Sequence, residues 1–103
     1  MAFYIVTMTH GNLDGWTRHL QPHIVFLREI LEEGVLRASG PLTDASVKTG
    51  FLIIKANDRP HVEAIIARDP FAKEGLIDDL TIQVWDPLFG AFASESSGAI
   101  PRD

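Results

Sequence analysis

Residues 35–56 read VLRASGPLTDASVKTGFLIIKA, and this stretch decides the fold. Two runs rich in apolar residues, Val35 to Leu42 and residues 48–56, flank a polar loop around Asp44, which is the pattern of two strands joined by a loop. A helical segment precedes this pair of strands, and another follows it. Strands joined by so short a connection pair antiparallel, because parallel neighbours need a long crossover between them.

The remaining segments complete a β-α-β-β-α-β order. Residues 2–8 are nearly all apolar or β-branched and predict the first strand. A helix is expected to follow up to Glu33, its regular part starting near Gln21 and residues 15–20 forming a separate turn, because Pro22 is unfavourable inside a helix. The last three elements, two helices and a strand, are expected over residues 59–68, 70–74 and 80–85. This order predicts an α+β, ferredoxin-like domain with both main helices on one face of a four-stranded antiparallel sheet.

Size and composition exclude several classes of protein. The 103 residues have room for one domain with one hydrophobic core. The formal charge of −5 argues against the basic surface that nucleic-acid binding requires. No apolar run approaches the roughly 18 residues of a membrane span, and Met1 to Met8 lack a leader pattern. With no cysteine, the chain has no disulfide, thiolate metal site or cysteine nucleophile. We therefore expect a cytoplasmic protein with neither nucleic-acid nor membrane partners.

The first and third strands are apolar at consecutive positions, FYIV in residues 3–6 and FLII in residues 51–54. This pattern indicates burial on both faces of the sheet. Two helices cover only one face, so we expect a homodimer in which a second copy covers the other. The folded domain is expected to span residues 1–87. Residues 88–103 are expected to form a tail whose first half packs and whose end is mobile.

Two ionisable residues occupy positions that should be apolar. His23 falls on the apolar stripe of residues 16–30, and Asp69 continues the spacing of Val62 and Ile65 by four residues. Stripes with this spacing face the core, so an imidazole and a carboxylate from different helices are expected to meet over the sheet. Such a pair is costly to bury unless its members satisfy each other, and it is a common arrangement for moving a proton.

These residues also have plain structural explanations. Asp69 followed by Pro70 is a good helix N-cap, a role compatible with pairing. His23 can be a core histidine bonded to a backbone carbonyl. His19 and His23 lie four residues apart, which is a spacing found for metal ligands on a helix. No acidic or cysteine partner completes a ligand set, so we expect no metal. His10 lies in the predicted turn and is expected to be solvated.

Four landmarks of the chain resemble the YciI-like (YCII-related) family. They are the helix histidine His23, the segment Gly34 to Leu42 with its Gly-Pro pair, the box Asp69 to Leu76, and the last strand to Trp85. The resemblance implies a dimeric α+β barrel and an active-site histidine–aspartate pair. The family's clearest assigned activity is dehydrochlorination of a chlorinated hydroxyhydroquinone. The chain is therefore a candidate 5-chloro-2-hydroxyhydroquinone dehydrochlorinase.

In that role Asp69 would orient the imidazole of His23, whose other nitrogen would take a proton from a substrate hydroxyl without any cofactor. Ser39 is the nearest candidate donor to the developing oxyanion, unless its hydroxyl is satisfied locally. A flat substrate also needs apolar walls and a close approach to the backbone. The residues expected to provide these features are Gly40, Pro41, Pro70, Phe71 and Trp85.

Two other classes of function stay open. The same fold serves as a non-catalytic dimeric module that binds a small ligand or a partner protein. That alternative is favoured if His23 and Asp69 lie far apart, or if backbone groups occupy both nitrogens of the imidazole. A haem- or oxygen-dependent monooxygenase is a third class, because related dimeric barrels carry out such reactions, but the sequence shows no dedicated site for it.

Overall fold

The computed structural model describes residues 1–101 of the chain, and it has the expected α+β, ferredoxin-like fold. The four strands are β1 (Ala2–His10), β2 (Leu36–Pro41), β3 (Lys48–Ala56) and β4 (Asp79–Trp85). The helices are α1 (Leu13–Glu32), α2 (Arg59–Ile66) and α3 (Pro70–Lys73), with a 3₁₀ turn η1 (Ala93–Glu95) near the C-terminus. All strand pairs are antiparallel in the order β2-β3-β1-β4, which confirms the predicted fold class.

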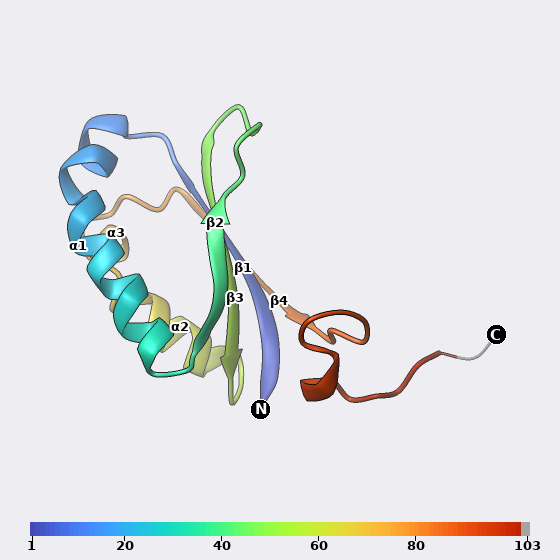
Figure 1. The fold of residues 1–103 in the computed structure, drawn as a ribbon. Helices are drawn as coiled ribbons and strands as arrows, with labels where there is room; N and C mark the ends of the chain where they lie inside the picture. Colours follow the sequence, from blue (N-terminus) through green and yellow to red (C-terminus); the bar gives the residue numbers. More distant parts are fainter. Residues whose placement is uncertain (102–103) are drawn as a thin grey trace.

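The helices form one layer against one face of the sheet, and the C-terminal segment lies on the other side, beyond the end of β4 (Figure 1). Alternate β1 side chains, Tyr4, Val6 and Met8, face the helix layer and are buried there with Phe26 and Ile30 of α1. Among residues 1–101, no helix combines the length and apolar character needed to cross a membrane.

The first helix is continuous over 20 residues, so the separate turn expected over residues 15–20 is wrong. Its start is secured by Asn12, whose side chain accepts a hydrogen bond from the amide of Gly15 at 2.9 Å. Gly15 itself packs closely, because an added Cβ would lie 2.5 Å from a methyl carbon of Leu76. Pro22 removes one backbone donor from this long helix, and the burial of the apolar face of α1 outweighs that local loss.

Strand β1 is two residues longer than expected, and this changes the surroundings of His10. The strand continues to His10, which pairs across the sheet with Lys48, the first residue of β3. Because side chains alternate along a strand, His10 shares the helix-facing side with Met8. Its side chain is only 3% exposed, and Nδ1 lies 2.7 Å from the carbonyl oxygen of Leu76. The prediction of a solvated histidine is therefore wrong.

The tail of the chain covers part of the second face of the sheet. Phe92 packs on Phe3 with ring centroids 5.5 Å apart, and Phe3 is almost fully buried. Glu95 accepts hydrogen bonds from Arg37 at 2.5 Å and from Lys55 at 2.8 Å, which ties the tail to β2 and β3. Residues 102–103, part of the end expected to be mobile, lie outside the described residues.

Candidate active site

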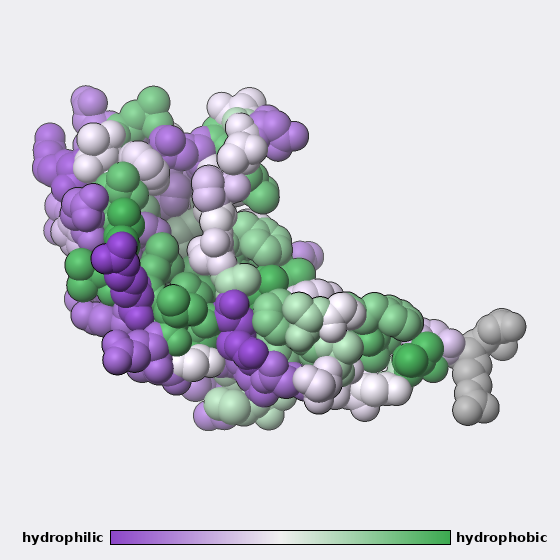
Figure 2. All heavy atoms as spheres, viewed as in Figure 1, coloured by the Kyte–Doolittle hydropathy of each residue, from purple (hydrophilic) through white to green (hydrophobic). Residues whose placement is uncertain are grey.

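A cavity of about 330 Å³ opens between α1 and the ends of β2 and β3. The surface is hollowed between the helix layer and the projecting β2–β3 hairpin (Figure 2). The walls are mainly apolar, and none of the described lining residues carries a carboxylate. The polar residues that line the cavity are His10, His23, Ser39, Lys48 and Thr49. Apolar walls with a few polar groups are typical of sites for small molecules.

The two helical stripes bring His23 and Asp69 into contact. Nδ1 of His23 lies 2.8 Å from Oδ1 of Asp69, and the Asp69 side chain is fully buried. An ionised carboxylate only accepts hydrogen bonds, so Nδ1 of His23 donates the proton. In the neutral imidazole this leaves Nε2 unprotonated and able to act as a base. Since His23 lines the cavity, its ring contributes a basic nitrogen to a mostly apolar site.

Asp69 holds the imidazole and caps a helix with the same oxygen atom. It is the N-cap of α3, and Oδ1 also accepts the amide hydrogen of Phe71 at 2.9 Å. Oδ2 is buried without a hydrogen-bond partner in the part of the chain that the structure describes. The capping and pairing explanations of Asp69 therefore apply together. The start of α3 fixes the position of the carboxylate, and the carboxylate fixes the imidazole.

Phe71 forms a wall against the same imidazole. Its ring lies parallel to that of His23, with centroids 4.0 Å apart and planes inclined by 15°. The ring of His10 contacts Phe71 as well, at a centroid distance of 4.8 Å. Phe71 is 1% exposed, so the surrounding core holds this ring in place. The short segment from Asp69 to Phe71 thus supplies both the partner of the imidazole and the ring that packs on its face.

Three of the other predicted site residues reach the cavity, from β2. Ser39, Gly40 and Pro41 line it and are solvent-exposed at this edge of the sheet. A Cβ added at Gly40 would meet no atom within 4 Å, and because Gly40 pairs with Phe51 this open space lies on the face of the sheet away from the helices. Pro70 begins α3 and does not line the cavity.

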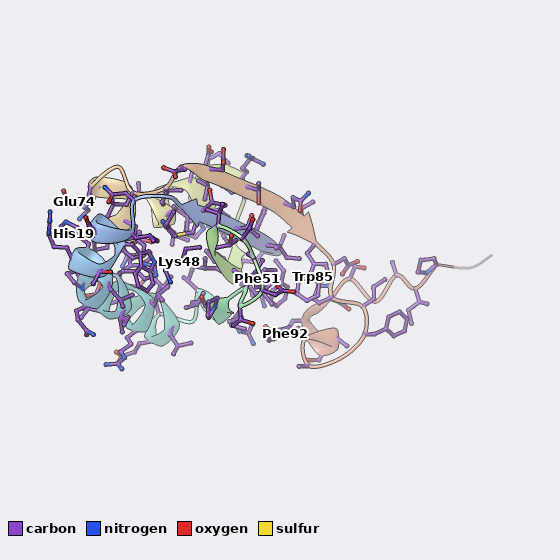
Figure 3. All side chains as sticks on the ribbon, turned by 90° about the horizontal axis from the view of Figure 1, so that it is seen from above. His19, Lys48, Phe51, Glu74, Trp85 and Phe92 are labelled. Carbon is purple, nitrogen blue, oxygen red and sulfur yellow. The ribbon has the colours of Figure 1, made fainter. Side chains whose placement is uncertain are left out.

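Trp85 also lies away from the cavity, and its expected role as a wall of this site is corrected. It pairs with Phe3 at one end of β1, whereas the cavity lies at the other end, beside His10. The Trp85 ring packs edge-on against Phe3 at a centroid distance of 6.2 Å. Figure 3 shows Trp85 and Phe92 at the end of the molecule remote from Lys48.

The sequence reasoning missed three polar residues of the cavity, His10, Lys48 and Thr49. Lys48 extends over Trp16 of α1, with Nζ 4.0 Å from the ring centroid. This cation–π contact places an ammonium group at the edge of the cavity. The alternation of Tyr4, Val6 and Met8, continued by one more step, would have placed His10 on the cavity side.

His19 is a neighbouring histidine with no place in this site. It lies one helical turn before His23 on α1 and does not line the cavity. Within residues 1–101, no three His, Cys, Asp or Glu side chains lie close enough together to hold a metal ion.

Fold and site together define a ferredoxin-like α+β domain with a histidine–aspartate pair at an apolar cavity. A family model for the YCII-related domain matches residues 1–86, so the chain belongs to this family. A comparison with curated proteins found no match. Among solved structures, the chain is similar to 5-chloro-2-hydroxyhydroquinone dehydrochlorinase from Burkholderia phenoliruptrix in complex with 2,5-dihydroxybenzoquinone. The TM-score is 0.70 at 21% identity, over 81% of this chain and 92% of that one.

Proposed function

We propose that the protein is a cofactor-independent lyase that removes HCl from a chlorinated hydroxyhydroquinone. The observation that carries this proposal is the 2.8 Å contact between His23 and Asp69, which leaves Nε2 of the imidazole free at a cavity. The similar fold of a dehydrochlorinase supports the choice of substrate class. The apolar walls and the absence of carboxylates among the described lining residues suit an aromatic ring that becomes anionic.

In the proposed reaction, Nε2 of His23 takes the proton of a hydroxyl group next to the chlorinated carbon. Electron density moves into the ring, the chlorinated carbon takes up a proton, and the oxygen becomes a ketone. The hydroxyl on the carbon opposite the new ketone then loses its proton, and its electrons form a second carbonyl. The ring double bond shifts, and the C–Cl bond breaks with chloride leaving. The sum is a hydroxybenzoquinone and HCl, so no external oxidant or reductant is needed. General base catalysis of this kind contributes roughly 10²–10⁴-fold.

The surroundings of His23 supply the positioning that this reaction needs. Phe71 and Trp16 offer aromatic surface on the walls of the cavity, and its volume of about 330 Å³ leaves room for a flat ring. Ser39 and Lys48 reach the same space and are the proposed donors to the oxygen that develops negative charge.

The alternative is a dimeric module that binds a small ligand or a partner protein without catalysis. Two features would favour it: a large separation of His23 from Asp69, or backbone hydrogen bonds to both imidazole nitrogens. In the described part of the chain neither is present, because Nδ1 is bound by Asp69 itself. The geometry therefore supports the lyase over the binding module. A cytoplasmic location stays a prediction of the sequence.

The test is anaerobic turnover of 5-chloro-2-hydroxyhydroquinone by the purified protein, without added metal or cofactor. Chloride release and quinone absorbance are followed for the wild type, His23→Gln and His19→Gln. The matched control changes the other histidine of α1, which lies outside the cavity. We expect release by the wild type and the control only. Full activity of His23→Gln would refute the assigned base, and binding without turnover by the wild type would favour the non-catalytic module.

We also propose that the protein is a homodimer in which the second faces of two sheets stack. The tail covers Phe3, whereas Ile5 and Phe51, further along this face, are only partly buried within one chain. Light scattering during size-exclusion chromatography should give twice the chain mass. Phe51→Glu should give the monomer mass, while Val84→Glu, on the helix-facing side of β4, should stay dimeric. A monomeric wild type would refute the dimer.

A further inference from the structure

A second imidazole of the cavity has no role in the steps assigned to His23. His10 is almost fully buried, yet its ring lines the cavity. Its Nδ1 lies 2.7 Å from the carbonyl oxygen of Leu76, and because a carbonyl only accepts, Nδ1 carries the proton. The neutral ring therefore has an unprotonated Nε2. This atom has no partner among the described residues and is not fully buried, so it opens toward the cavity.

The two basic nitrogens belong to one site. The rings of His23 and His10 both pack on Phe71, with centroids 4.0 Å and 4.8 Å from it. The two imidazole centroids are therefore no further apart than the sum of these distances. They come from different elements, α1 and β1, and both line the same cavity.

The proposed reaction releases two hydroxyl protons from opposite carbons of the ring. His23 accounts for the first. The second proton leaves as the C–Cl bond breaks, and it needs an acceptor other than the His23 nitrogen that took the first. None of the described lining residues carries a carboxylate, and after His23 the strongest neutral base among them is the unprotonated ring nitrogen of His10.

We propose that Nε2 of His10 accepts this second hydroxyl proton, and that the site selects aromatic substrates with oxygen atoms at opposite ring carbons. The inference rests on the proposed lyase activity and deepens it. In this step the O–H bond of the second hydroxyl breaks and an N–H bond forms on His10. The oxygen electrons form the C=O bond, the ring double bond shifts, and chloride leaves with the electrons of the C–Cl bond. The imidazolium returns its proton to solvent after product release.

The neighbouring groups fit this assignment. The carbonyl of Leu76 accepts from Nδ1 and stabilises the positive charge that His10 acquires, as a hydrogen-bond acceptor does for a general base. Lys48, the cross-strand partner of His10, lies near the same end of the sheet. Its ammonium group can balance the charge of the substrate oxyanion, because it also reaches the cavity.

The key variant is His10→Asn, because the asparagine amide can still donate to the carbonyl of Leu76 while the group at the Nε2 position is lost. We expect the wild-type melting temperature and a kcat/KM for chloride release that is lower by about 100-fold. A purely structural histidine would leave kcat/KM unchanged in this variant. The second variant is His10→Ala, assayed with and without added imidazole. We expect imidazole to restore part of the chloride release, since a small base can occupy the vacated space.

The outcomes separate the two proposals. If the wild type and His10→Asn release chloride at the same rate, the role of His10 is refuted and the lyase stands. If His10→Asn releases chloride slowly but also melts at a much lower temperature, the slow rate can come from unfolding. The imidazole rescue of His10→Ala then decides, and a lack of rescue refutes the role of His10. If the wild type releases no chloride, the lyase fails and this inference fails with it.

Discussion

The imidazole of His23 lies parallel to the ring of Phe71, with centroids 4.0 Å apart. Asp69, two residues before Phe71, accepts a hydrogen bond from the edge of the same imidazole. One short segment thus contacts both the face and the edge of the imidazole. The contact with Asp69 selects the tautomer, and the contact with Phe71 limits rotation of the ring. In the proposed reaction, an imidazole held in this way needs little reorganisation to act as the base, which is how positioned groups contribute to catalysis.

Asp69→Asn separates the two roles of this residue. Asparagine is also a good N-cap, so we expect the free energy of unfolding to change by no more than about 1 kcal/mol. The negative charge that stabilises the protonated imidazole is lost, and an amide can impose the wrong tautomer. We expect kcat/KM for chloride release to fall by roughly 10²–10⁴-fold. Anaerobic kinetics and thermal unfolding measure both effects, and wild-type kinetics would show that Asp69 is only a cap.

Lys48→Met tests the ammonium group at the cavity. The product analogue 2,5-dihydroxybenzoquinone is an anion at neutral pH, and Lys48 is a cation that reaches this site. We expect its Kd to rise by about tenfold, with a weaker dependence on salt than in the wild type. Calorimetric titration at two ionic strengths measures this. The matched control is Lys73→Met on the exposed side of α3, and equal Kd values for both variants would contradict the assignment.

Ser39→Leu tests the cavity side of β2. Ser39 pairs with Leu52, so its side chain lies on the helix-facing side of the sheet, and it is solvent-exposed, so the variant should fold normally. The larger side chain would occupy space at the cavity that a flat ring needs, and we expect the Kd of the same quinone to rise by about tenfold or more. Ala38→Leu, one residue earlier on β2 and outside the cavity, should bind as the wild type does. Unchanged binding by Ser39→Leu would show that the ligand does not approach this strand.

The fold could be predicted from sequence because its signals are local and agree with one another. The two runs in residues 35–56 and the capped starts of α2 and α3 predict the element order directly. The pairing of His23 with Asp69 could be anticipated because each continues an apolar stripe. The family could be identified for a related reason, since its landmarks lie within single elements and do not depend on tertiary contacts.

The predictions failed where they depended on the exact residue at which a strand ends, or on the end of the sheet at which a residue lies. The glycine and asparagine after His10 resemble the start of a turn, so the strand was expected to end two residues early and this histidine was assigned to solvent. Trp85 was assigned to the site as an apolar wall for an aromatic ring, but strand periodicity does not say at which end of the sheet a cavity opens. The position of Lys48 at the cavity follows from its cross-strand pairing with His10, and the sequence pattern does not give that register.

Glu95→Gln tests how the tail is held to the sheet. Hydrogen bonds from Arg37 and Lys55 lower the pKa of the Glu95 carboxyl from its ordinary 4.5 to about 2. A carboxylate with a lowered pKa in the folded protein stabilises the docked tail above pH 4.5, and this stabilisation is lost as the pH falls toward 2. At neutral pH the variant lacks the negative charge, so its tail should be released in the same way as in the acidified wild type.

Chymotrypsin cleavage after Phe92, which packs on Phe3, reports release of the tail at neutral pH, and the emission of Trp85, which packs against Phe92, reports it across the acid range. We expect faster cleavage of Glu95→Gln and a Trp85 signal that no longer changes between pH 4.5 and 2. The matched control is Glu32→Gln on the exposed surface of α1, which should behave as the wild type does. Chloride release should be unchanged in both variants, because the cavity lies at the other end of β1. Equal cleavage rates for the wild type and Glu95→Gln would show that the packing of Phe92 holds the tail without the ion pairs.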